Sequence, residues 1–177
     1  MKRLAIALLA LALLLGGGFL WARLFAGRNV GPIPGGWLHG EVATELPSDW
    51  SFANRDPYLM VESDAWTLPY SASVWFLAHQ GRIHLLLPGF FGDGLKRRLD
   101  DDPRVRIAWD GVLYDQVAVP VTETADASAL LAPGIRRQFA IEIDSAVRPI
   151  TSANGAEMWI YRLDDPPRDG GIAAPRR

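Results

Sequence analysis

The 177-residue chain has no cysteine and only three histidines, and these shortages exclude several kinds of site. Without thiols the chain can form no disulfide framework, and a closed structural zinc site is almost excluded. The sequence also lacks a G-x-S-x-G elbow and a G-x-x-x-x-G-K-S/T loop, which argues against a serine hydrolase of that design and against a P-loop nucleotide site. The fold must therefore be stabilised by an apolar core alone.

A strong excess of charge of one sign is also missing. The chain has 18 basic and 20 acidic residues, and four of the basic ones lie in the first 28 positions: Lys2, Arg3, Arg23 and Arg28. The rest of the chain thus has 14 basic residues against all 20 acidic ones, a net charge of −6. Nucleic-acid binding needs a basic surface, so we predict no nucleic-acid partner.

The N-terminal stretch "MKRLAIALLALALLLGGGFLWARLF" is one long apolar run. Lys2 and Arg3 begin it, and no charged residue follows from Leu4 to Ala22. This length is close to the roughly 20 apolar residues that cross a bilayer as a helix. A cleaved secretory signal has the same basic start, but its apolar part usually covers about 7–15 residues before an A-x-A-like site. We predict a membrane anchor over 1–28, contacting lipid through residues 4–22, with a cleaved signal as the alternative.

The basic residues on the two sides of this run nearly cancel in the positive-inside rule. The free amino terminus favours a cytoplasmic N-terminus. We therefore predict a single-pass protein of the bacterial inner membrane whose domain lies on the periplasmic, extracytoplasmic side.

The remaining chain divides by composition. Glycine and proline are concentrated in "NVGPIPGG" (29–36), which predicts a linker, and "DDPPRDGGIAAPRR" (164–177) predicts a disordered tail. The folded domain should cover 37–163, an ordinary size for one domain. Short helices are expected only at connections, within 93–101 and 125–143.

Strand patterns dominate the domain, and turn signals separate them. The predicted strands are 58–63, 72–79, 82–88, 104–110, 112–122 and 157–163. They predict a mainly β fold with short helices, a small closed or partly closed barrel.

Two hairpins can be registered from their turns. Gln80-Gly81 as a two-residue loop places His79 opposite Arg82, and the strong type I′ signal Asp110-Gly111 places Arg106 opposite Asp115. In the first hairpin, alternation gives one wholly apolar face, which we expect in the core, and one mixed face. The core face carries Val74, Phe76, Ala78, Ile83, Leu85 and Leu87, and the mixed face carries Trp75, Leu77, His79, Arg82, His84 and Leu86.

Two features of the chain could bind a ligand: a pair of histidines and a short charged helix. His79 and His84 are diagonal neighbours on the mixed face, roughly 7–8 Å apart, so they would bind a metal only with a third ligand, and we predict no metal site. In the helix expected over 93–101, basic residues stand near the start and acidic ones at the end, against the helix dipole. An anion bound at the helix start would explain this order. The alternative is a helix whose charges simply face water.

The segment "PYSASVWFLAHQGRIHLLLPGFFGDGLKRRLDDDPRVRIAWDGVLYDQVAVPVTE" resembles the FMN-binding split-barrel superfamily, which includes pyridoxamine-phosphate-oxidase-like and deazaflavin-dependent nitroreductase-like proteins. The similar features are a strand, a turn, a second strand, a helix with a lysine, "DPRVRI" and a hairpin that ends in "AVPV". The pieces "PGGWLHGEV", "DWSF" and "WIYRL" fit an uncharacterised membrane-anchored bacterial branch of that group.

The resemblance implies a six-stranded split β-barrel, here preceded by one transmembrane helix, that is commonly a homodimer with its cofactor between the subunits. It implies that Lys96, with Arg97 beside it, helps to hold the cofactor phosphate, and that His84 and Leu86 line the cofactor. The chain departs from the pattern at "LLLPGFF" (85–91), where relatives often have a small hydroxyl residue.

From this resemblance we expect a membrane-tethered protein that binds FMN or a deazaflavin and acts as an oxidoreductase of unknown substrate. The alternative is a non-catalytic envelope binding or assembly module that has lost its cofactor. A third possibility is a barrel that binds haem or another small ligand through His84.

Overall fold

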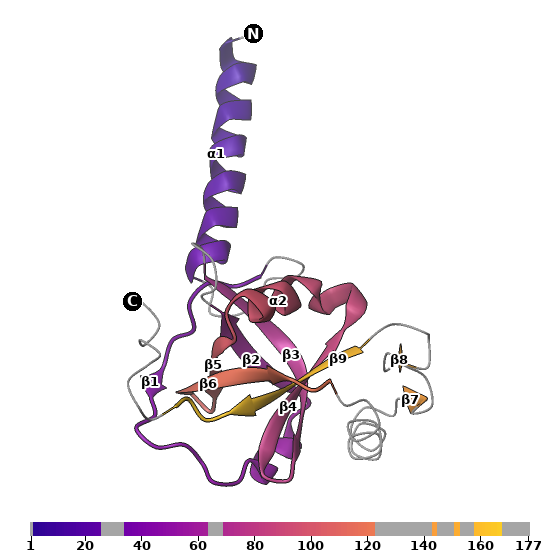
Figure 1. Cartoon of the computed structure of the whole chain (residues 1–177). Helices are drawn as coiled ribbons and strands as arrows, with labels where there is room; N and C mark the ends of the chain where they lie inside the picture. Colours follow the sequence, from indigo (N-terminus) through magenta and orange to yellow (C-terminus); the bar gives the residue numbers. More distant parts are fainter. Residues whose placement is uncertain are drawn as a thin grey trace.

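The computed structural model describes residues 2–25, 34–63, 69–122, 143–144, 151–152 and 158–167 (Figure 1). In chain order its elements are α1 (Lys2–Phe25), β1 (Glu41–Val42), η1 (Ser51–Arg55), β2 (Tyr58–Ser63), β3 (Tyr70–His79), β4 (Arg82–Pro88), α2 (Gly89–Asp101), β5 (Arg104–Trp109), β6 (Val112–Pro120), β7 (Ile143–Asp144), β8 (Thr151–Ser152) and β9 (Met158–Asp164).

Six of these strands close into an antiparallel barrel. The order is β2-β3-β4-β9-β6-β5, and β5 pairs with β2 to complete the ring. The short β1 adds in parallel to β6 outside this ring. The predicted mainly β fold with a six-stranded barrel is therefore confirmed.

Both predicted hairpin registers are confirmed. His79 pairs with Arg82 across the β3–β4 turn, and Arg106 pairs with Asp115 across β5–β6. Each turn has two residues with positive φ, as a type I′ turn requires: Gln80 at 51° and Gly81 at 76°, Asp110 at 48° and Gly111 at 79°. The turns thus set the register that places one face of each hairpin in the core.

Alternation along the strands fills the barrel with side chains. All six residues predicted on the core face of the first hairpin belong to the main apolar core. Helix α2 closes one end of the barrel with Leu95 and Leu99, which are 1% and 3% exposed. At the other end, Trp50 and Ala53 of the η1 region join the core together with Trp109 of β5. A barrel of this size is a packed core, so a ligand would have to bind on its outside or at its rim.

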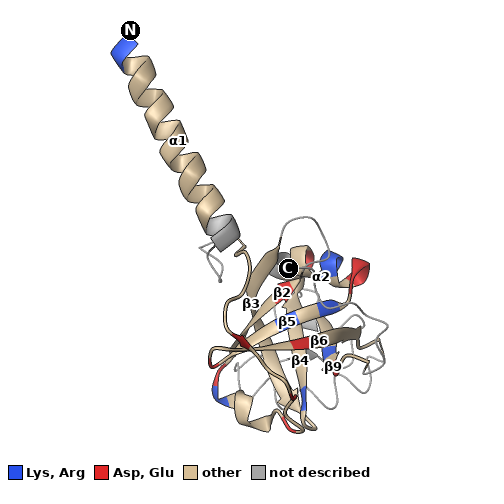
Figure 2. Cartoon of the chain, turned by 90° about the vertical axis from the view of Figure 1, so that its left-hand side faces the viewer, with Lys and Arg blue, Asp and Glu red and all other residues tan. Residues whose placement is uncertain are grey.

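Helix α1 stands apart from the barrel (Figure 1). Its residues Lys2–Trp21 are apolar enough to span a membrane, and none of the hydrophobic window is buried against the protein. Figure 2 shows charge on the described part of α1 only at its N-terminal end, whereas both signs are spread over the barrel. Length and composition fit a membrane anchor, and they fit a signal sequence equally well.

Several predicted boundaries were wrong. Helix α2 begins at Gly89, four residues before the predicted start, because the two glycines of "GDG" do not interrupt it. Strand β9 ends at Asp164, so this residue does not belong to the tail. Gly35, within the predicted linker, exchanges two backbone hydrogen bonds with Ser71 of β3. The helices expected within 125–143 lie outside the described residues, apart from Ile143, which is in β7.

Candidate functional site

Lys96 and Arg97 lie in the second half of α2. Because the helix begins at Gly89, these side chains are about two turns from its N-terminus, and the basic residues do not form the predicted anion site there. The Lys96 ammonium instead donates a 2.6 Å hydrogen bond to Asp100 Oδ2, one turn along the helix, and lies 5.4 Å from the centre of the Trp159 ring. Arg97 is exposed.

The same acidic residue connects α2 to the barrel. The Tyr161 hydroxyl of β9 donates a 2.8 Å hydrogen bond to Asp100 Oδ1. The hydrogen bond from Lys96 lowers the pKa of the Asp100 carboxyl, while burial and then the nearby carboxylate raise the pKa of Tyr161. On the neighbouring turn, the buried guanidinium of Arg98 lies 4.8 Å from the Tyr70 ring centre. These contacts hold α2 across the end of the barrel.

His84 and Leu86 lie elsewhere, on the outer face of β3, β4 and β9. His84 stands between Leu77 and Arg162 on the neighbouring strands, and the next row is Trp75, Leu86 and Ile160. Leu86 is fully buried, and His84 is 9% exposed. The face that was expected to be open to solvent or to a ligand is therefore largely covered along these two rows.

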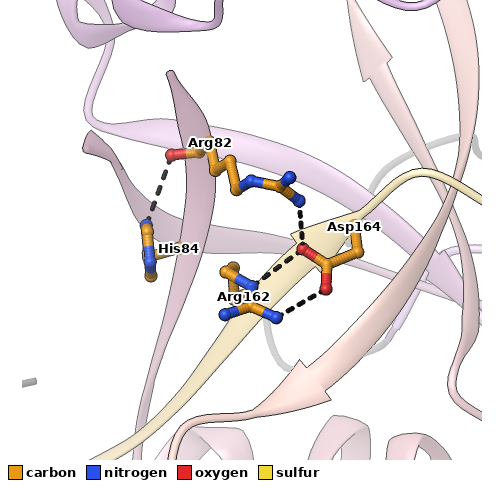
Figure 3. Close-up of polar contacts among 4 residues, drawn as sticks. All are labelled: Arg82, His84, Arg162 and Asp164. Atoms are coloured by element: carbon orange, nitrogen blue, oxygen red, sulfur yellow. Dashed lines mark hydrogen bonds and ion pairs between the residues drawn. The ribbon is translucent and has the colours of Figure 1, made fainter. Parts of the chain in front are cut away.

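The His84 ring contacts the backbone carbonyl of Arg82 (Figure 3). Its Nδ1 atom lies 3.3 Å from the Arg82 carbonyl oxygen, and its ring centre lies 6.0 Å from that of His79. Burial lowers the pKa of His84 to about 4, and the positive charge of Arg162 acts in the same direction. At neutral pH the imidazole is therefore uncharged.

Two arginines share one carboxylate beside this imidazole (Figure 3). Asp164 accepts hydrogen bonds from Arg162, at 2.8 and 2.7 Å, and one of 2.5 Å from Arg82. The bonds from Arg162 lower the pKa of Asp164. The group carries one net positive charge and joins β4 to β9.

Three buried polar side chains, Glu62, Ser71 and Gln116, were not predicted from the sequence. Glu62 of β2 is 2% exposed, accepts a hydrogen bond from the Leu38 amide, and faces Arg106 on β5. Ser71 Oγ and Gln116 Nε2 are buried without a hydrogen-bond partner in the described part of the chain. For Glu62 the sequence offers one signal, a single charged residue within the apolar strand "YLMVES".

The four residues predicted to hold a flavin lie at two places on the barrel. His84 lies four residues before Pro88, the last residue of β4, which is about 13 Å along a strand, and α2 begins at the next residue, Gly89. Lys96 and Arg97 thus lie at the end of the barrel, while His84 and Leu86 lie on its side. Leu86 offers no exposed surface for a cofactor. The predicted contacts of these four residues with a flavin stay a prediction.

The sequence matches no family model, and none of the curated proteins is similar enough to count as a relative. Solved structures with a similar fold include HutZ, the heme storage protein of Vibrio cholerae, at 15% identity and a TM-score of 0.47, covering 64% of this chain and 85% of that one. A pyridoxamine 5'-phosphate oxidase-like protein of Listeria innocua is 10% identical, with a TM-score of 0.45 and coverage of 64% and 88%.

A NimC/NimA family protein of Clostridium acetobutylicum is 8% identical, with a TM-score of 0.40 and coverage of 60% and 73%. These are split-barrel proteins of the superfamily that the sequence resembles. At such identities the similarity concerns the fold alone.

Proposed function

We propose that the chain is a membrane-tethered split-barrel protein whose barrel is a non-catalytic binding or assembly module. The supporting observation concerns the titratable groups of the described residues whose pKa is clearly shifted. All of these pKa values are shifted away from pH 7. A general acid or base works best with a pKa near the operating pH, and active sites are where such tuning is usual. These groups are instead tuned to remain in one protonation state.

The acids illustrate this point. Hydrogen bonds from Lys96, Arg104 and Arg162 lower the pKa values of Asp100, Asp102 and Asp164, respectively. Burial moves Tyr161 in the opposite direction, upward from its ordinary value, and moves His84 down to about 4. At pH 7 these carboxylates are ionised, and the phenol and imidazole are neutral. Their geometry serves to hold strands and α2 together.

A flavin-dependent oxidoreductase is the second candidate, because such enzymes need few acid–base residues. One observation favours it. The Lys96 side chain is 29% exposed and its ammonium lies beside the half-buried Trp159 ring. A cation for a phosphate and an aromatic ring therefore meet at the end of the barrel. FMN or a deazaflavin would supply the redox chemistry, and Lys96 would bind its phosphate. A homodimer in the inner membrane, with an extracytoplasmic barrel, is part of either proposal.

Absorption spectra and flavin titrations of the full chain in detergent distinguish the candidates. A colourless protein that takes up neither FMN nor a deazaflavin supports the binding module and eliminates the oxidoreductase. Flavin that co-purifies, or that binds on titration, contradicts the cofactor-free module.

If flavin binds, Lys96→Met should weaken binding about 10-fold or more, because a hydrogen bond to a charged group contributes about 1.5–3 kcal/mol. Arg55→Met, which removes a cation from η1 at the other end of the barrel, is the matched control and should bind as the wild type does. Equal affinities of Lys96→Met and wild type would exclude Lys96 from the site.

A further inference from the structure

Two imidazoles face each other on the outer face of the β3–β4 hairpin. His79 is the last residue of β3, and His84 is the third residue of β4, opposite Leu77. The ring centres are 6.0 Å apart, and the ring planes are inclined at 66°. The tight turn at Gln80-Gly81 fixes the pairing of both strands and thereby the backbone positions of the two histidines on the same face.

The separation suits two imidazoles bound to one ion. A metal–nitrogen bond of about 2.1 Å puts the imidazole centre roughly 3.2 Å from the metal. Two such rings would then be about 5.2 Å apart at a tetrahedral angle and about 6.4 Å apart in a linear arrangement. The observed 6.0 Å lies between these limits.

The nitrogen atoms are also suited to metal binding. His79 Nε2 is buried and has no hydrogen-bond partner in the described part of the chain. His84 Nδ1 faces the Arg82 carbonyl at 3.3 Å, and in the tautomer whose Nδ1–H donates to this oxygen the lone pair is on Nε2. A metal-ligating histidine usually donates its other ring N–H to a carbonyl or carboxylate oxygen, which fixes the orientation of the ring.

The surroundings restrict the kind of ion. Arg82 and Arg162 share the Asp164 carboxylate, so no free carboxylate from this group is available beside the imidazoles. Calcium and magnesium prefer oxygen ligands, whereas imidazole nitrogen suits zinc, copper and nickel. Among the described residues no group of three histidines or acids stands together, so water or a bound ligand would complete the coordination.

We propose that His79 and His84 together bind one transition-metal ion of the class that prefers imidazole, represented by Cu²⁺ or Zn²⁺. The site goes beyond the binding module proposed above and does not depend on flavin. It lies on the side of the barrel, away from Lys96 and α2. An ion held by two histidines keeps open positions, so it can bind a further ligand.

The test uses the full chain in detergent, without a polyhistidine tag, and Cu²⁺ alone as the probe. Electron paramagnetic resonance should show one bound Cu²⁺ per chain with two coupled imidazole nitrogens. His79→Ala and His84→Ala should each weaken Cu²⁺ binding by about 100-fold and leave at most one coupled nitrogen, since even outer-sphere changes reduce metal affinity 10–100-fold.

His39→Ala is the matched control, because His39 is exposed and remote in sequence, and it should retain the wild-type spectrum. His84→Asn, with folding checked by circular dichroism, separates loss of the ligand from loss of the fold. No Cu²⁺ binding by the wild type, fewer than two coupled nitrogens, or unchanged affinity in folded His79→Ala and His84→Asn would each overturn the proposal.

Discussion

At the scale of single residues, His84 links the protonation of one ring to the stability of the barrel. It is 9% exposed, and burial lowers its pKa to about 4 from an ordinary value of 6.5. A proton therefore binds the unfolded chain more readily than the folded one between these two values. The contribution of neutral His84 is fully present above pH 6.5 and is lost as the pH falls toward 4.

We predict that the metal-free protein becomes less stable as the pH is lowered from 6.5 to 4. The slope should approach about 1.4 kcal/mol per pH unit, or on the order of 3 kcal/mol in total, because one proton separates the two states. Urea unfolding in the presence of a chelator, followed at several pH values, measures this slope.

His84→Gln should flatten the dependence in this window, whereas His39→Gln, at an exposed position, should leave it unchanged. The carboxyl groups with lowered pKa values, such as Asp100 and Asp164, titrate below this window and act at lower pH. A slope that is the same in wild type and His84→Gln would show that His84 does not cause it.

At the scale of elements, the two type I′ turns set the register of the β3–β4 and β5–β6 hairpins of the barrel. Asp110-Gly111 sets the β5–β6 register, and the ion pair between Arg106 and Asp115, at 2.7 Å, follows from it. A methyl group added at Gly111 would meet no other atom within 4 Å. The requirement for glycine there is therefore one of backbone conformation, since φ is 79°.

We predict that Gly111→Ala destabilises the domain by about 1–2 kcal/mol, the approximate cost of a left-handed conformation for an L-residue. Gly111→Asn should cost less, because asparagine enters this region more readily. Denaturant unfolding of the three proteins tests the order. Equal losses for alanine and asparagine would indicate that a contact of the glycine, not its φ angle, matters.

At the scale of the whole molecule, the membrane-spanning candidate and the barrel are separate bodies. The side chains of Lys2–Trp21 are exposed, and the barrel closes its own core with α2 and the η1 region. The chain joins the barrel at Gly35, which pairs with Ser71 at the α2 end of β3. Nothing in the described core depends on α1.

We predict that removing residues 1–33 transfers the protein from the membrane fraction to the soluble fraction without changing its Tm by more than about 2 °C. The reason is that a change of about 1 kcal/mol shifts the Tm of a domain of this size by roughly 4–8 °C, and no buried apolar contact is lost. Cell fractionation and thermal unfolding measure the two effects. A full-length chain found in the soluble fraction would contradict the anchor, and a large loss of Tm would contradict the independence of the barrel.

Local pattern was enough to predict the six strands of the barrel, the two turns and the interior faces of β3 and β4, whereas the two-residue strands β1, β7 and β8 were not predicted. These features depend on residues near one another in the chain: turn residues with positive φ, and the alternation of apolar side chains. The extent of α2 was less predictable. Its glycines predict a late start, yet burial of Leu95 and Leu99 against the barrel stabilises the helix from Gly89 onward.

The partners of the candidate site residues depended on contacts between distant segments. Lys96 was expected to face an anion, but strand β9 brings Trp159 and Tyr161 beside α2, and Asp100 takes the ammonium. Leu86 was expected to be open, but it is buried once β9 pairs with β4. By itself, the sequence determined an apolar N-terminal run long enough to span a membrane, a β domain after it and the registers of two hairpins, because those are short-range effects. The contacts between polar side chains were decided by the tertiary structure, in which the pairings β2–β5 and β6–β9 close the barrel. These pairings join strands that are far apart in the sequence, so no local pattern predicts them.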